Sequence, residues 1–105
     1  MDLKGKVSLV TGGAGGIGAK VCEKLAALGS FVYVCDIREA TELVNRINAK
    51  YRESRAASAK CDISNKEDVE AMYRRISEQR GGVDILINNA AVYGPLEAHH
   101  FPEIS

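Results

Sequence analysis

The chain has no excess charge of either sign, no long hydrophobic run and no C-x-x-C cysteine pair. Fourteen Lys and Arg residues balance fourteen Asp and Glu residues, so no overall field attracts nucleic acid or an anionic membrane. The apolar runs are too short for a membrane span or for the core of a signal peptide. We therefore expect a cytoplasmic protein whose partner is a small molecule, with no nucleic acid and no membrane.

Cysteine and histidine are scarce and do not form metal-ligand patterns. Cys22, Cys35 and Cys61 are odd in number and fall in apolar stretches, which predicts reduced thiols that act as small hydrophobes. His99 and His100 are adjacent, so their side chains point in different directions, and no third ligand has zinc-like spacing. No metal site is predicted.

The composition describes one globular domain. With 105 residues, 46% of them hydrophobic and 27% charged, the chain can form a core but has no room for a second domain of ordinary size. Hydrophobic periodicity predicts strands at 6–11, 31–36, 56–61 and 83–88, and helices that begin near residues 17, 40 and 64. The helix near residue 64 starts with the capping sequence Ser64-Asn65-Lys66-Glu67.

Strands that alternate with helices are typical of parallel strands joined by right-handed crossovers. The expected fold class is therefore α/β, an open sheet with helices on both faces.

A glycine-rich turn, residues 11–18, lies between the first strand and the first helix. There the exposed N–H groups and the dipole of the helix favour a pyrophosphate. Two registers fit the turn: Gly13, Gly15 and Gly18 match G-x-G-x-x-G, and Gly12, Gly16 and Gly18 match T-G-x-x-x-G-x-G. Spacing alone does not choose between them.

Hydrolysis of ATP or GTP is disfavoured by the residue after the turn. A phosphate loop of the NTPase type needs lysine directly after its last glycine, and Ala19 stands there. The turn therefore indicates a dinucleotide.

Together with Asp36 at the end of the second strand and Asn88-Asn89-Ala90 after the fourth, the glycine-rich turn resembles that of the short-chain dehydrogenase/reductase family over residues 4–95. The resemblance implies a Rossmann-type doubly wound parallel sheet, truncated after about the fourth strand. Residues 1–95 would form the NAD(P)-binding half-domain, and 96–105 a loop leading to a missing catalytic half. It also implies the second glycine register, with Gly12, Gly16, Ile17 and Gly18 contacting the cofactor.

The expected cofactor is NAD, with NADP less favoured. Asp36 follows Gly18 by 18 residues, where a carboxylate accepts hydrogen bonds from the adenosine ribose and repels a 2′-phosphate. Arg38 lies close enough in sequence to keep NADP as the second option.

The resemblance assigns further contacts around the cofactor. It places Asp62 at the adenine amino group, Ile63 at the flank of the adenine, and the backbone of Asn89 and Ala90 beside the ribose. Taken alone, Asp62 fits a helix-entry residue equally well. Ala91 departs from the glycine that the family has after its N-N-A sequence.

Catalytic residues are missing from the sequence. The family uses a Ser together with a Y-x-x-x-K pair, in which the ammonium lowers the pKa of the phenol so that it exchanges a proton with substrate. None of the four tyrosines has lysine four places on. We expect a truncated or partial chain without its own catalysis, whose parent family interconverts alcohols and ketones by hydride transfer.

Two alternatives explain the missing pair differently: a stand-alone nucleotide-binding or regulatory module, and an inactive remnant. A small alcohol or ketone would be a partner only if the missing half were supplied. The apolar fourth strand, with Ile85, Leu86 and Ile87 at an unpaired edge, predicts self-association.

Overall fold

The computed structural model describes residues 1–89 of the chain. Its elements follow one another as β1 (Val7–Thr11), α1 (Gly16–Ala27), β2 (Phe31–Asp36), α2 (Thr41–Tyr51), β3 (Ala56–Lys60), α3 (Lys66–Arg80) and β4 (Ile85–Asn88). The predicted loop 96–105, both histidines, Ala90 and Ala91 lie outside the described residues. No helix within 1–89 has the length and apolarity needed to cross a bilayer.

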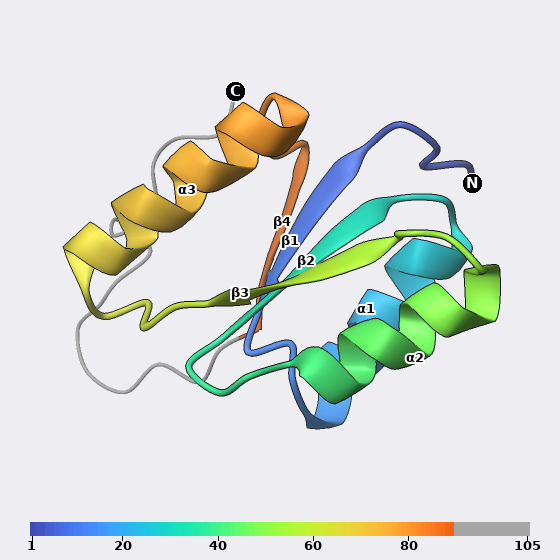
Figure 1. Cartoon of the computed structure of the whole chain (residues 1–105), viewed down its shortest axis with the longest axis horizontal. Helices are drawn as coiled ribbons and strands as arrows, with labels where there is room; N and C mark the ends of the chain where they lie inside the picture. The colour runs from blue at the N-terminus through green and yellow to red at the C-terminus, as the bar shows by residue number, and fades with distance from the viewer. Residues whose placement is uncertain (90–105) are drawn as a thin grey trace.

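The four strands form one parallel sheet in the order β3-β2-β1-β4. Helices α1 and α2 cover one face and α3 covers the other (Figure 1). The expected α/β class and doubly wound, Rossmann-type sheet are thereby confirmed. Because all strands are parallel, their carboxyl ends meet at the same edge of the sheet, where the glycine-rich turn also lies.

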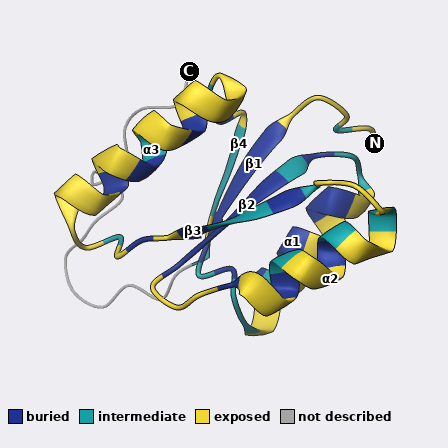
Figure 2. Ribbon diagram, in the orientation of Figure 1, coloured by how far each residue is buried: buried dark blue, intermediate teal, exposed yellow. Residues whose placement is uncertain are grey.

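Successive residues of each strand point to opposite faces of the sheet, so the protein has two hydrophobic cores, one on each face. Leu9, Tyr33 and Cys35 pack with the buried stripe of α3, whereas Val10 and Val34 pack beneath α1 and α2. Figure 2 shows the dark buried stripes of the helices turned toward the sheet. The central strands are covered on both faces, which explains their near-continuous apolar sequences.

The ends of two elements differ from the sequence prediction. The fourth strand begins at Ile85, and Asp84 before it accepts a hydrogen bond from the backbone N–H of Val7 through its side chain at 2.8 Å. Helix α3 is capped by Asn65, whose side chain accepts from the N–H of Asp68, and the predicted cap at Ser64 is wrong. Ser64 is already engaged, since its N–H and hydroxyl both donate to a neighbouring carboxylate.

The three cysteines are free and buried, as predicted. Burial raises the pKa of the Cys22 thiol to about 12, so this side chain is neutral at physiological pH. It packs on the α1 and α2 side of the sheet as a small hydrophobe.

Candidate functional site

The glycine-rich turn has two positions whose backbone requires glycine. Gly12 has φ +64° and Gly16 has φ +56°, both in the left-handed region that side chains with a Cβ rarely adopt. A Cβ at Gly16 would meet no atom within 4 Å, so conformation rather than crowding demands glycine there. These angles fall on the register Gly12, Gly16 and Gly18.

At two other positions of the turn, close packing leaves no space for a side chain. A Cβ at Gly18 would lie 2.1 Å from the carbonyl oxygen of Gly12, and one at Gly13 would lie 2.9 Å from Cγ1 of Val34. Gly18 thus allows α1 to approach the turn, and Gly13 allows the turn to approach β2. The turn therefore contains glycines of two kinds: Gly12 and Gly16 have a positive φ, and Gly13 and Gly18 leave no space for a Cβ.

The amino end of α1 is open toward this edge. Its N-cap residue, Gly15, has no side chain to accept a hydrogen bond, and the first turn holds no acidic residue. Helix α3 differs, because Asn65 caps it and Glu67 and Asp68 occupy its first turn. The unpaired N–H groups and positive dipole end of α1 are therefore available to an anion.

Asp36 ends β2 beside the turn and is 7% exposed. Its Oδ2 accepts a hydrogen bond from the N–H of Ala14 at 3.1 Å, and its Oδ1 accepts from the N–H and the Nε of Arg38 at 3.1 and 3.2 Å. Burial opposes ionisation, but the hydrogen bonds from Arg38 and Ala14 outweigh it, so the pKa of Asp36 lies below its usual value. The side chain is a carboxylate at neutral pH.

Arg38 lies across the glycine-rich turn, which the sequence pattern did not predict. Its Nη2 is 3.3 Å from the point where a Cβ of Gly15 would stand, while the same guanidinium is paired with Asp36. The turn has no basic residue of its own, yet this bond brings a positive charge to it. The Arg38 side chain is 67% exposed, so a ligand can displace it without opening the core.

A set of polar contacts joins the end of β4 to the turn. The Thr11 hydroxyl donates to Oδ1 of Asn88 at 2.9 Å and accepts from the N–H of Asn89 at 2.9 Å. The Asn89 side chain donates to the carbonyl oxygen of Gly12 at 3.3 Å. The two asparagines therefore hold the turn from the side opposite Asp36.

Asp62 and Ile63 follow β3 at the same edge of the sheet. Oδ1 of Asp62 accepts from the hydroxyl and the N–H of Ser64 at 2.7 and 3.0 Å, and these bonds lower the pKa of Asp62. Asp62 therefore has the contacts of a helix-entry residue, one of the two interpretations that its sequence position allows. Ile63 is half-buried and packs against the core on the α3 side.

Two exposed isoleucines also belong to this edge. Ile17, a predicted contact residue in the first turn of α1, is 72% exposed, and Ile37, directly after Asp36, is 64% exposed. Ile37 was missed by sequence reasoning; its place next to Asp36 was the available signal. Both offer apolar surface beside the polar groups of the turn.

Comparison with known proteins agrees with this geometry. The family model described as short chain dehydrogenase matches residues 6–105. An uncharacterized oxidoreductase of Bacillus subtilis, YuxG, is 43% identical over 89 residues, which is 83% of this chain and 13% of that protein. Farnesol dehydrogenase of Aedes aegypti is 37% identical over 91 residues, covering 84% of this chain and 36% of that protein.

Solved structures with a similar fold are also dehydrogenases. A hydroxysteroid dehydrogenase from Escherichia coli superposes with a TM-score of 0.80 at 33% identity, covering 90% of this chain and 40% of that one. A short-chain type dehydrogenase/reductase from Mycobacterium marinum gives 0.80 at 29% identity, covering 96% and 41%. The chain thus spans well under half the length of these relatives.

Proposed function

Because the chain belongs to the short chain dehydrogenase family, we propose that it is the NAD-binding part of an oxidoreductase of that family. The proposed contact residues are Gly12, Gly16, Ile17, Gly18, Asp36, Asp62, Ile63 and Asn89. The open end of α1 would hold the pyrophosphate, since its N–H groups have no side-chain cap. A cytoplasmic location is part of the same proposal.

The observation that carries the choice of NAD is the position of Asp36. Its carboxylate stands beside the glycine-rich turn, ionised and fixed by the N–H of Ala14. A carboxylate at this point accepts hydrogen bonds from the two hydroxyls of an adenosine ribose and repels a 2′-phosphate. Ile37 would add apolar contact on the adenine side.

Arg38 is the residue that opposes this preference. A guanidinium over the turn can pair with a 2′-phosphate, but here it is held by the same carboxylate that repels the phosphate. Either dinucleotide would separate the Asp36–Arg38 ion pair. NAD would replace it with hydrogen bonds from the ribose hydroxyls to Asp36, whereas NADP would place its 2′-phosphate beside this carboxylate. We infer that NAD is favoured.

The chemistry of the parent protein would be alcohol/ketone interconversion. The bound nicotinamide supplies hydride transfer, and this chain's residues bind and orient the dinucleotide. Proton exchange with a small alcohol or ketone would need the catalytic residues of the other half of the family fold.

A second candidate function is a nucleotide-binding module that acts without that half. It rests on the same open end of α1 and on Asp36, which would bind a dinucleotide with or without a catalytic half. The two functions differ in one experiment: addition of a separately expressed catalytic half from a relative restores alcohol oxidation only in the first case.

Calorimetric titration of the chain with NAD and with NADP tests the proposal. We expect NAD to bind more tightly, and Asp36→Asn to reduce the preference by about tenfold because one charged hydrogen-bond acceptor is lost. Glu78→Gln, which removes an exposed carboxylate from α3, is the matched control and should change neither affinity. Tighter binding of NADP by the unmodified chain would overturn the choice of cofactor.

A further inference from the structure

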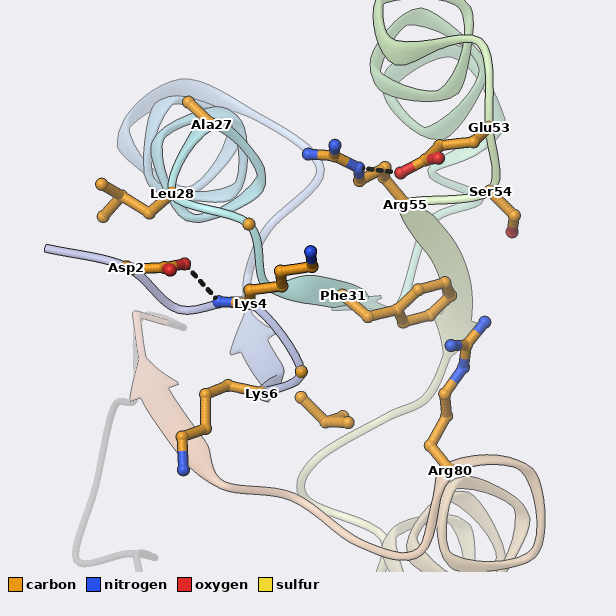
Figure 3. Close-up of a pocket in the computed structure, with 13 residues that line it drawn as sticks. Asp2, Lys4, Lys6, Ala27, Leu28, Phe31, Glu53, Ser54, Arg55 and Arg80 are labelled. Carbon is orange, nitrogen blue, oxygen red and sulfur yellow. Dashed lines mark hydrogen bonds and ion pairs between the residues drawn. The ribbon is translucent and has the colours of Figure 1, made fainter.

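A cavity lies at the opposite edge of the sheet from the glycine-rich turn. Its volume is about 610 Å³, and it opens between the segment before β1, the carboxyl end of α1, the loop before β3 and the end of α3. Figure 3 shows Lys4 and Arg80 on two sides of Phe31 in this cavity. The volume is that of a small-molecule site, well beyond a single ion.

The lining of the cavity is positively charged although the whole chain is neutral. Four basic residues, Lys4, Lys6, Arg55 and Arg80, face two acidic ones, Asp2 and Glu53. The charge is therefore concentrated at this edge.

Arg55 has a structural explanation, because the carboxyl ends of helices attract cations. Its Nε donates to Glu53, and its Nη1 donates to the carbonyl oxygen of Ala26 near the end of α1 at 3.0 Å. This arginine closes the helix end and is already neutralised.

Lys4 and Arg80 are not neutralised in this way, although Arg80 also stands at the carboxyl end of a helix, α3. Within residues 1–89 neither side chain has an ion pair or hydrogen bond, although the backbone N–H of Lys4 donates to Asp2. The guanidinium of Arg80 is stacked on Phe31, with Cζ 3.5 Å from the ring centroid, so its position is fixed while its N–H groups remain available. In Figure 3 the Lys4 side chain extends toward Phe31, and that of Lys6 extends away from it.

We propose that this cavity binds a phosphate monoester, with Lys4 and Arg80 holding the phosphate and Phe31 contacting the organic part. A guanidinium fixed by stacking is suited to a phosphate, because its planar donors match two phosphate oxygens. The remaining volume and the apolar surface leave space for the ester group. This site is independent of the dinucleotide, which would bind at the other edge.

Phenyl phosphate is the probe that we would use, with inorganic phosphate and phenol as its two separate halves. Titration of the isotope-labelled chain at constant ionic strength should give saturable amide shifts at Gly5, Gly29 and Phe31. Phenyl phosphate should bind more tightly than either half. Addition of NAD should leave the affinity unchanged, because the two sites lie at opposite edges.

Variants decide whether the named side chains hold the phosphate. Lys4→Gln and Arg80→Gln should each weaken binding about fivefold, as expected for one exposed ion pair, whereas Arg80→Lys should keep part of the affinity. Arg74→Gln, on the same helix but outside the cavity, is the matched control. Equal effects of Arg74→Gln and Arg80→Gln would overturn the proposal, as would an absence of saturable shifts or shifts confined to residues 12–18.

Discussion

The carboxylate of Asp36 and the backbone N–H of Ala14 are joined by a hydrogen bond of 3.1 Å across 22 residues of sequence. The bond connects the end of β2 to the middle of the glycine-rich turn. The group proposed to recognise the ribose therefore also fixes the turn that would hold the phosphates. Loss of the carboxylate is expected to affect both stability and nucleotide binding.

Asp36 should make the stability of the chain sensitive to acid. Its pKa is lowered in the folded protein by the hydrogen bonds from Arg38 and Ala14, which exceed the opposing effect of burial. A depressed pKa contributes stability that is present above the unfolded value of 3.8 and is lost as the pH falls through the folded value. The free energy of unfolding, measured in urea from pH 6 down to pH 2, should fall more steeply for the unmodified chain than for Asp36→Asn. Parallel curves would contradict this role.

Gly18→Ala should be more damaging than Gly16→Ala. The first substitution places a Cβ 2.1 Å from the carbonyl oxygen of Gly12, a backbone atom that cannot move alone. The second meets open space and costs only the left-handed conformation. We expect destabilisation of about 3 kcal/mol for Gly18→Ala by overpacking and about 1 kcal/mol for Gly16→Ala by backbone strain. Urea unfolding measures both, and the reverse order would show that the turn relaxes around Gly18.

Thr11→Val should weaken nucleotide binding as well as stability. The hydroxyl bonds to Asn88 and Asn89, so its loss removes two of the hydrogen bonds between the turn and the end of β4, at a cost of about 1–3 kcal/mol. Ser8→Ala is a matched control on the same strand, because the Ser8 hydroxyl is equally buried but bonds to Ser30. Calorimetry with NAD should separate the two, since Ser8→Ala lowers stability alone. Equal NAD affinities in both variants would remove the role given to Thr11.

The chain should self-associate through β4. Within residues 1–89 this strand pairs only with β1, and its other edge carries no partner strand. Ile85 is half-buried, so Ile85→Lys places a charge at the edge without emptying a buried position. Sedimentation velocity should show an associated form that Ile85→Lys reduces. Ser77→Lys adds the same charge to an exposed position of α3 and should leave association intact.

The sheet and its helices could be predicted because their signals are local and repeated. Leu9 and Val10 show the principle: neighbours on β1 belong to opposite cores, and a strand covered on both faces reads as a continuous apolar run. The ends of elements were less predictable. Ser64 and Asn65 both have cap-forming side chains, and only the three-dimensional position of Asp62 decides which one is free to cap α3.

The candidate site could be predicted in its residue types but not in its contacts. Gly12 and Gly13 cannot be told apart in the sequence. Glycine is required at Gly12 by a positive φ and at Gly13 by close contact with Val34, and both depend on the folded sheet. The bond between Asp36 and Arg38 has no sequence signal beyond proximity. The basic cavity could not be predicted from the sequence, because Lys4, Arg55 and Arg80 come from segments far apart in the chain.

Both ends of strand β1 are held by hydrogen bonds to residues 77 or 78 positions later in the chain. Asp84 accepts from Val7 at one end, and Asn88 and Asn89 bond to Thr11 at the other. During synthesis on the ribosome, these hydrogen bonds to β1 can form only after residues 84–89 have left the exit tunnel. Nearly all the described chain is therefore made before these bonds form, so a nascent chain halted short of Asp84 would lack them at both ends of β1.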